Sequence, residues 1–367
     1  MTIIIFIIIL AVLILVHEFG HFIVAKIAGV RVDEFAIGFP PKVFSFKPKK
    51  SDTRYSLNLI PFGGFVKIFG ENPDKESISG PDSKRSFVNK PKWIQASILS
   101  AGVLFNIIFA WILISISFMS GVPTAISGDF QNVKDPKILL IEVLPGSPAE
   151  MAGLKVGDEV VFAESKSETI QNEKLTISFL ENLIAGSLNS EINISYKREG
   201  KIETTKIKPI SGILDNKPAI GIAMSMIGTI KLPFYKAPLE AFSFVLNAIK
   251  SMIVGIFGLI KGAVLGEGNF SSITGPVGIV GLVGQAWNFG FVNLMMFTAF
   301  ISINLAVINI VPFPALDGGR ILFILIEKIK GSVIKPKIVN AINGAGFFLL
   351  IILMFVITYN DISRLFQ

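Results

Sequence analysis

The sequence contains no cysteine and only two histidines among its 367 residues. The lack of cysteine excludes disulfide bonds and thiolate metal sites, so any metal ion has to be bound through histidine, carboxylate or amide groups. Charged residues are also scarce, at 17% of the chain, whereas hydrophobic residues make up 51%. An average soluble protein has about 25% charged residues. The composition therefore predicts a membrane protein.

Four long apolar stretches are candidates to cross a membrane, because each is close to the roughly 20 residues that a spanning helix needs. They are residues 2–30, 94–121, 291–313 and 344–359. The first has no Lys or Arg ahead of its apolar core and is longer than the core of a secretory signal, so we expect it in the mature protein. A fifth stretch, 241–260, contains Asn247 and Lys250, which favours a helix in the membrane interface or a re-entrant segment.

The balance of charge differs between the polar segments. Residues 31–92 hold 12 Lys or Arg against 7 Asp or Glu, residues 320–340 hold 5 against 1, and residues 123–220 hold 11 against 14. Because basic loops remain on the cytoplasmic side of a membrane, the first two segments are expected to face the cytoplasm and the third the outside. This orientation in the cell (inner) membrane also explains the net charge of +7 without a nucleic-acid partner.

These observations predict a polytopic α-helical membrane protein with about four transmembrane helices, an inserted α/β domain and a small membrane-associated β-hairpin. The expected segments are a first transmembrane helix (1–30), a cytoplasmic segment with the hairpin (31–92), a second transmembrane helix (93–121), an extracytoplasmic domain (122–230), an amphipathic or re-entrant segment (231–290), a third transmembrane helix (291–319), a cytoplasmic loop (320–343), and a fourth transmembrane helix with the C-terminus (344–367). The hairpin is expected within residues 55–70, as two short strands around Pro61, Gly63 and Gly64.

His17, Glu18 and His21 form an H-E-x-x-H motif inside the first apolar stretch. On a helix, positions i and i+4 lie on one face, where two imidazoles can bind one zinc ion and Glu18 lies within reach of an attacking water. The alternative is that the motif merely caps the membrane segment, but a cap does not need a second histidine one turn on. Ionisable groups within an apolar helix are costly and usually functional. The motif therefore predicts a zinc site with Glu18 as the catalytic base.

The third metal ligand has to be sought among carboxylates and amides. A catalytic zinc usually takes three protein ligands and leaves a fourth position open. Asp317 ends the run Asn309–Gly319 after the third apolar stretch, and the prolines and glycines there break the helix. Irregular backbone at membrane depth is tolerated mainly around cavities. We therefore expect Asp317 to be the third ligand. The alternative is that Asp317 only forms the turn at the end of the helix, beside Arg320.

The outer block resembles a PDZ domain of the bacterial protease-associated type. The resemblance lies in its order of strands and one helix over residues 138–208, and in the run S-P-A-E-M-A-G-L-K-V-G-D at 147–158. One possibility is that backbone amides near Leu144, Pro145 and Gly146 bind a C-terminal carboxylate. The block could equally act as a size filter that admits substrates with short outer domains, and both possibilities stay open.

Four pieces together resemble the site-2 protease family, the zinc intramembrane metalloproteases of the bacterial sigma-E regulator protease type. They are the H-E-x-x-H motif, residues 34–40 with 63–71, the PDZ-like block, and N-x-x-P-x-P-x-L-D-G beginning at Asn309. The resemblance implies a zinc-dependent endopeptidase that hydrolyses peptide bonds within transmembrane segments of single-span proteins. Such substrates are membrane-anchored regulators, often trimmed first by an upstream site-1-type protease.

The resemblance also assigns roles to individual residues. It makes His17, His21 and Asp317 zinc ligands and Glu18 the base. It makes Asn309 a residue that holds the substrate backbone, and it implies that the extended substrate pairs with a strand formed by Phe65, Val66, Lys67, Ile68 and Phe69. An exposed strand edge would replace the hydrogen bonds that a substrate helix loses when it unwinds.

The sequence differs from the family in two respects, and two other classes of function have to be weighed against a protease. The chain has one PDZ-like block where the best-known members have two, and Val103 stands where the family often has proline. A non-catalytic PDZ membrane scaffold is one alternative, but a scaffold need not retain Glu18. A metal transporter is the other, although transport would favour more polar residues along several helices.

Overall fold

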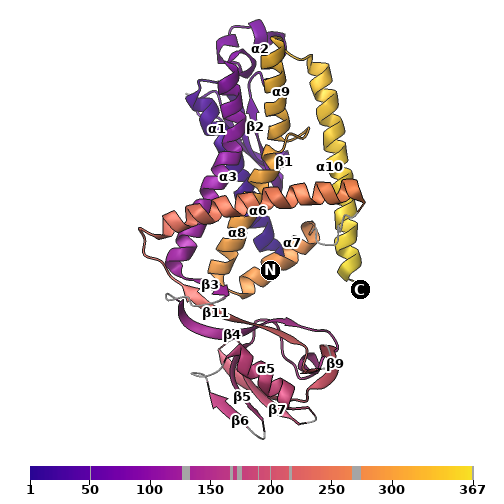
Figure 1. The fold of residues 1–367 in the computed structure, drawn as a ribbon. Coiled ribbons are helices and arrows are strands. Elements are labelled where there is room, and N and C mark those ends of the chain that lie inside the picture. Colours follow the sequence, from indigo (N-terminus) through magenta and orange to yellow (C-terminus); the bar gives the residue numbers. More distant parts are fainter. Residues whose placement is uncertain are drawn as a thin grey trace. The chain divides into compact units, whose positions relative to one another are not determined.

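The computed structural model describes residues 1–49, 51–125, 133–165, 168–171, 176–188, 190–198, 200–214, 217–266 and 274–365. The chain forms two compact units, which are described separately: a membrane unit of residues 1–117 and 234–367, and an inserted domain of residues 118–233. The membrane unit contains α1 (Thr2–Ile27), β1 (Val32–Phe46), β2 (Arg54–Ile68), α2 (Lys75–Ser79), α3 (Lys92–Ser120), α6 (Ala237–Leu265), α7 (Pro276–Asn288), α8 (Phe291–Ile310), α9 (Asp317–Lys330) and α10 (Pro336–Leu365) (Figure 1).

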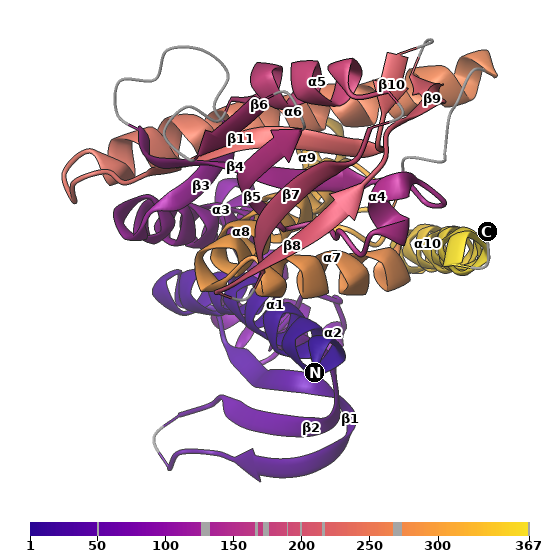
Figure 2. The ribbon, with the colours of Figure 1, turned by 90° about the horizontal axis from the view of Figure 1, so that it is seen from below.

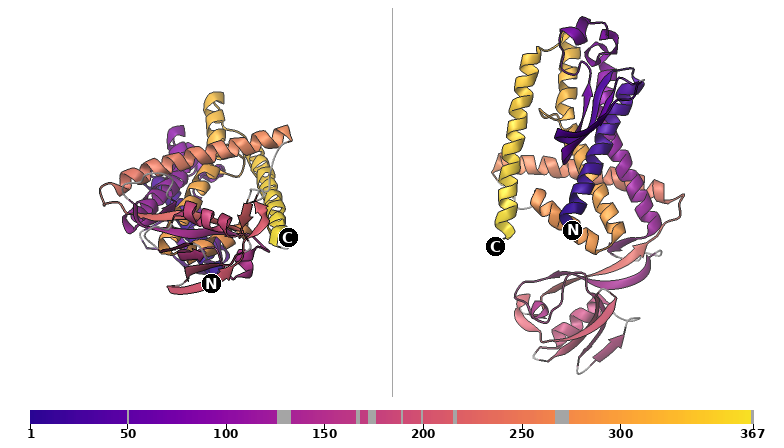
Figure 3. Two further views of the ribbon diagram at one scale, coloured as in Figure 1. Left: turned by 60° about the horizontal axis from the view of Figure 1, so that its bottom comes forward. Right: turned by 180° about the vertical axis from the view of Figure 1, so that it is seen from behind.

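Within the described residues, five helices are long and apolar enough to cross a membrane: α1, α3, α8, α10 and residues 237–262 of α6. The expectation of several apolar helices with an inserted β domain is confirmed, but the expected number of four is not. The difference is α6, which runs crosswise to α3 and α10 (Figure 3). Residues 320–343, expected to be a loop, include most of α9 and the beginning of α10.

One face of α1 is buried, and it is the face that carries both histidines. Ile9, Leu13, His17 and His21 follow one another at helical spacing and are all buried. Ile9 and Leu13 pack with Val283 of α7 and with α8, which anchors the first half of the helix. The two histidines lie on the next turns of the same face, where α3 is the neighbour.

The β1–β2 sheet lies beside α1 (Figure 2). Its register differs from the expected hairpin within residues 55–70. Phe35 of β1 pairs with Val66 and also with Tyr55, so the two ends of β2 flank the same part of β1 and do not pair with each other. Strand partners are set by contacts far along the chain, which the local turn residues did not reveal. Among the described residues, the segment 64–68 has no strand on its other side and is a sheet edge.

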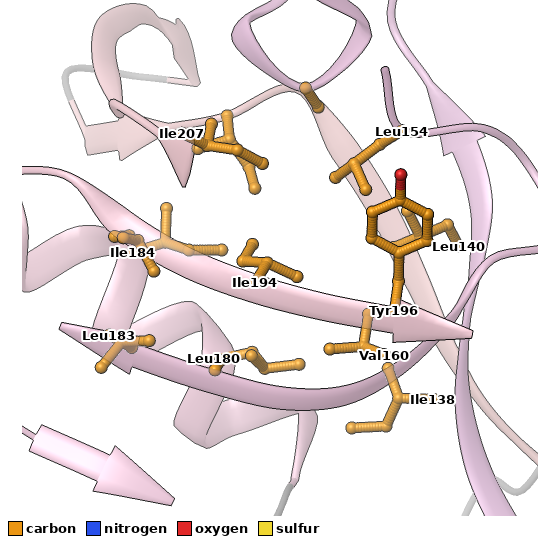
Figure 4. Close-up of a cluster of buried hydrophobic side chains, with 14 residues drawn as sticks. Ile138, Leu140, Leu154, Val160, Leu180, Leu183, Ile184, Ile194, Tyr196 and Ile207 are labelled. Atoms are coloured by element: carbon orange, nitrogen blue, oxygen red, sulfur yellow. The ribbon is translucent and has the colours of Figure 1, made fainter. Parts of the chain in front are cut away.

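The inserted domain is built on one sheet with the strand order β3-β11-β4-β5-β7-β8. Its elements are β3 (Val122–Ala125), β4 (Val133–Val143), α4 (Pro148–Met151), β5 (Glu159–Ser165), β6 (Glu168–Gln171), α5 (Ile177–Gly186), β7 (Ile192–Arg198), β8 (Lys201–Ile207), β9 (Ile210–Leu214), β10 (Lys217–Ala219) and β11 (Ile222–Ile230). Leu180 and Ile184 of α5 pack with Leu140, Val160 and Ile194 of the sheet (Figure 4). The domain therefore has a hydrophobic core of its own.

The run at 147–158 has a structural explanation within this domain. Ser147 caps α4 by accepting a hydrogen bond from the backbone of Glu150. Asp158 is 1% exposed, and Arg198 donates to both of its oxygens at 2.7 and 2.6 Å. A buried carboxylate is stable only when it is paired and hydrogen-bonded, so this aspartate serves the fold of the domain.

Candidate active site

His17 and His21 of α1 lie close to each other and close to the backbone of α3. The Nε2 atoms of the two imidazoles are 3.2 Å apart, as expected for neighbours one helical turn apart on the same face. The backbone of α3 comes so close that a Cβ on Gly102 would lie 2.5 Å from His21 Nε2 and 2.8 Å from His17 Nε2. Glycine at this position leaves the space in front of both ring nitrogens open.

Asp317 reaches the same point from α9. The chain leaves α8 at Ile310, and Asp317 begins the next helix after a short connection. The turn is tight, since a Cβ on Gly318 would lie 2.3 Å from the carbonyl oxygens of Ile310 and Val311. Only glycine fits there, which explains the D-G sequence of the motif.

The three side chains have the spacing that a zinc ion requires. Asp317 Oδ2 lies 3.1 Å from His17 Nε2 and 3.4 Å from His21 Nε2. Ligands at 2.0–2.1 Å from a tetrahedral zinc are about 3.3 Å from one another. Among the described residues, the buried Asp317 Oδ2 has no hydrogen-bond partner. Two imidazole nitrogens and one carboxylate oxygen thus converge on one point, and ligand atoms of these types fit zinc.

Each histidine has a partner that orients its ring. His21 Nδ1 is 2.8 Å from the carbonyl oxygen of Ile98, so Nδ1 carries the proton and Nε2 is left with its lone pair. His17 Nδ1 is 3.2 Å from the side-chain amide of Asn106 on α3. For His17 Nε2 to bind a metal, its Nδ1 must also carry the proton, and the Asn106 oxygen must accept it. The oxygen and the nitrogen of an asparagine side chain are assigned from their hydrogen-bond partners. A protonated Nδ1 on His17 therefore places Asn106 Oδ1 toward His17.

Replacing Asn106 by leucine is therefore expected to weaken zinc binding by roughly 10- to 100-fold, the usual effect of removing a group that orients a metal-binding histidine. Asn106→Asp keeps an acceptor oxygen and should retain most of the affinity. Competition with a zinc chelator in detergent measures both. Asn304→Leu on α8, whose amide donates to Phe300 instead, is the matched control. Equal zinc affinity in Asn106→Leu and wild type would contradict this orienting role.

The ligand cluster opens into a cavity, called the catalytic cavity below. It is lined by His17, Glu18, His21, Phe65, Val66, Ile68, Glu71, Leu99, Asp317 and Arg320. Glu18 shares this cavity with the three ligands and lies within hydrogen-bonding range of the Val66 backbone. Val66 belongs to the open edge of β2. A cluster of three candidate metal ligands, a glutamate and the edge of a strand therefore meet in one cavity.

Comparison with known proteins decides the family. The model of peptidase family M50 matches residues 5–353. The chain belongs to peptidase family M50. This M50 peptidase is 29% identical to the regulator of sigma-W protease RasP of Bacillus subtilis, over 100% of this chain and 99% of that protein. It is 34% identical to CPE1693 of Clostridium perfringens, over 95% of each chain.

Membership of the family confirms the resemblance seen in the sequence. The M50 peptidase is a membrane-embedded zinc metalloprotease, and neither a non-catalytic scaffold nor a metal transporter is favoured. Among solved structures, the chain is similar to the PDZ domain of the SdrC-like protein of Listeria monocytogenes, with 19% identity, 27% of this chain and 93% of that one covered, and a TM-score of 0.20. That likeness is too weak to bear on the fold.

The M50 peptidase brings some of the predicted substrate-binding residues to the catalytic cavity and leaves others outside it. Phe65, Val66 and Ile68 line the cavity. Lys67, Phe69 and Asn309 are not among the described residues that line the catalytic cavity. Lys67 is exposed, and Asn309 is half-buried on α8. The backbone of Phe69 is already engaged, because its N–H donates to Arg31 and its carbonyl accepts from Phe87.

The predicted peptide-binding loop of the inserted domain has partners within its own chain. The Leu144 N–H donates to the carbonyl of Gly221. The Gly146 N–H donates to the side chain of Glu150 at 2.6 Å. Pro145 has no N–H to offer. A carboxylate arriving at this loop would have to displace the Glu150 carboxylate.

Several groups in or beside the catalytic cavity of the M50 peptidase were not identified from the sequence. Gly102 and Asn106 were not assigned a role, and Arg320 was considered only as a neighbour of Asp317. Arg320 and Glu71 form an ion pair on the cavity wall. Contacts between residues so far apart in the chain leave no local pattern, although an amide in a spanning helix is itself an indication of function.

Proposed function

We propose that this M50 peptidase cleaves peptide bonds within the transmembrane segments of single-span membrane proteins, such as membrane-anchored regulators. The observation that carries the proposal is the shared cavity of the ligand cluster, Glu18 and the edge of β2. Both histidines lie well inside an apolar helix of 26 residues, so the reaction takes place at membrane depth. That a relative is named as a regulator of sigma-W protease supports a regulator as substrate.

His17, His21 and Asp317 are proposed to hold the zinc ion, and Glu18 is proposed to act as the base. Zinc, when bound, lowers the pKa of water in its coordination shell to about 7 and polarises the scissile carbonyl. Glu18 accepts the proton of the attacking water and returns it to the leaving amine. Ile98 and Asn106 keep the imidazoles in the tautomer that leaves Nε2 free.

The edge of β2 is proposed to hold the substrate in extended form. A helical substrate buries its peptide bonds in its own hydrogen bonds, so it has to unwind before attack. Pairing with residues 64–68 would replace the lost bonds next to Glu18. Asn309, which the family resemblance makes a holder of the substrate backbone, would have to reach the substrate from α8 outside the cavity lining.

The charge pattern supports a topology with the active site toward the cytoplasmic side and the inserted domain outside the cell membrane. In this arrangement α6 lies in the interface rather than across the bilayer, which keeps Asp317 on the same side as the histidines. An upstream site-1-type protease would trim the substrate first. Because the amides of Leu144 and Gly146 are engaged, we infer that the inserted domain excludes large outer domains rather than capturing a carboxylate.

Purified full-length enzyme in liposomes tests the proposal directly. A single-span model substrate is expected to be cut inside its apolar segment, with the site mapped by mass spectrometry. Chelation should stop the reaction and added zinc should restore it, because the three ligands hold the ion that activates water. Cleavage confined to the polar flanks of the substrate, or cleavage that survives chelation, would contradict the proposed activity.

A further inference from the structure

A second cavity, called the adjoining cavity, shares a wall with the catalytic cavity. The wall is formed by Glu71, Leu99 and Arg320, which line both. The adjoining cavity has a volume of about 90 Å³, well below the roughly 300–1,000 Å³ of small-molecule pockets, so it has room for a side chain rather than for a whole ligand. It is a space of its own beyond the Arg320–Glu71 ion pair.

The edge strand leads from one cavity to the other. β2 ends at Ile68, and the next residues, Gly70 to Pro73, form one side of the adjoining cavity. A peptide that pairs with residues 64–68 and continues in the same direction would leave the neighbourhood of Glu18, pass the Arg320–Glu71 ion pair and enter this cavity. At about 3.3 Å per extended residue, it would arrive there roughly three to six residues from the scissile bond.

The lining of the adjoining cavity is suited to an apolar side chain. Phe87, Phe323, Ile324 and Val339 form much of its surface. The carboxylate of Glu327, which also lines it, is already paired with Lys92 and with the backbone of Ile334. Burying an apolar side chain here removes its surface from water at no cost in unpaired charge.

From this geometry we propose that the adjoining cavity is a substrate-binding subsite. Its occupant is an apolar side chain of the substrate on the cytoplasmic side of the scissile bond. Most of the lining comes from residues 70–88 and 320–340, within the two segments whose basic character predicts a cytoplasmic position, and the rest comes from Gln95 and Leu99 of α3 and Asn343 of α10. The proposal rests on the proposed function, and it adds a second point of sequence selection some distance from the zinc site.

The test changes the volume of the adjoining cavity and the size of the substrate residue together. Val339→Trp fills the cavity, and Phe323→Ala enlarges it. A series of single-span substrates carries Ala, Leu or Trp at each of the positions three to six residues from the mapped cut. At one of these positions, the wild type should prefer Leu over Ala. Val339→Trp should lower the Leu-to-Ala ratio of kcat/KM about 10-fold, and Phe323→Ala should raise the rate for Trp.

Ile338→Trp is the matched control, because Ile338 is the exposed neighbour on α10 and does not line the cavity. It should leave the preference of the wild type unchanged, and zinc content should be equal in all variants. If the enzymes cut every substrate with the same ratios in wild type, Val339→Trp and Phe323→Ala, the subsite does not exist and the proposed function still holds. A wild type that cuts no substrate would instead contradict the proposed function.

Discussion

Glu18→Gln is expected to reduce cleavage by about 10²- to 10⁴-fold, the usual contribution of a general base, while zinc binding is retained. Glutamine has the size of glutamate but cannot take a proton from water. It can still occupy the space beside the Val66 backbone. The atoms that converge on the metal position belong to His17, His21 and Asp317, so the substitution leaves them in place. Rates of substrate cleavage and zinc content, measured on the same preparations, check both parts.

Glu240→Gln provides the control, since it makes the same chemical change on the exposed first turn of α6. It should cut at the wild-type rate. A Glu18→Gln enzyme that cuts as fast as wild type would move the base role to another group. A variant that has lost its zinc would show instead that Glu18 matters for the structure of the site.

The part of the site that could be predicted from the sequence is the part that depends on local geometry. His17 and His21 are neighbours because any α-helix brings positions i and i+4 together. Asp317 was reached by a different route, because the absence of cysteine and of a third histidine left few ligands to consider. The structure brings all three together, with separations of 3.1 to 3.4 Å between the ligand atoms.

What could not be predicted depends on how distant segments meet. The contact of His17 with Asn106 joins residues 89 positions apart, and that of His21 with Ile98 joins residues 77 positions apart. Both follow from the register of α1 against α3, which no periodicity in either helix specifies. The pairing of Phe35 with both ends of β2 was missed for the same reason.

The number of spanning helices shows a different limit. Hydropathy measures the cost of placing a segment in lipid, and by that measure residues 237–262 qualify as well as α8. The direction of a helix depends on its packing, and α6 runs crosswise to α3 (Figure 1). Lys250 within α6 favours the interface, since a lysine there can reach water. Composition thus shows that α6 is apolar enough to enter the membrane, whereas its packing sets the direction in which it lies.

Gly102→Ala is expected to lower zinc affinity by roughly 100-fold or more, beyond the effect of removing an orienting group. Its methyl group would lie 2.5 Å from His21 Nε2 and 2.8 Å from His17 Nε2, well inside contact distance. Neither ring can simply turn away, because Ile98 holds one and Asn106 the other. The ligand atoms would therefore lose the spacing of about 3.3 Å that zinc requires. Chelator competition on purified protein measures the loss.

Gly258→Ala in α6 separates this effect from that of adding a methyl group to any apolar helix. A Cβ at Gly258 has nothing within 4 Å, so the variant should bind zinc like the wild type and gain up to about 1 kcal/mol in helix propensity. The detergent-solubilised Gly102→Ala protein should also unfold at a lower temperature than zinc-free wild type, since the added methyl overlaps two buried rings that cannot turn away. A Gly102→Ala enzyme that binds zinc normally would mean that α1 and α3 can separate, and that the close approach of α3 is not what shapes the zinc site.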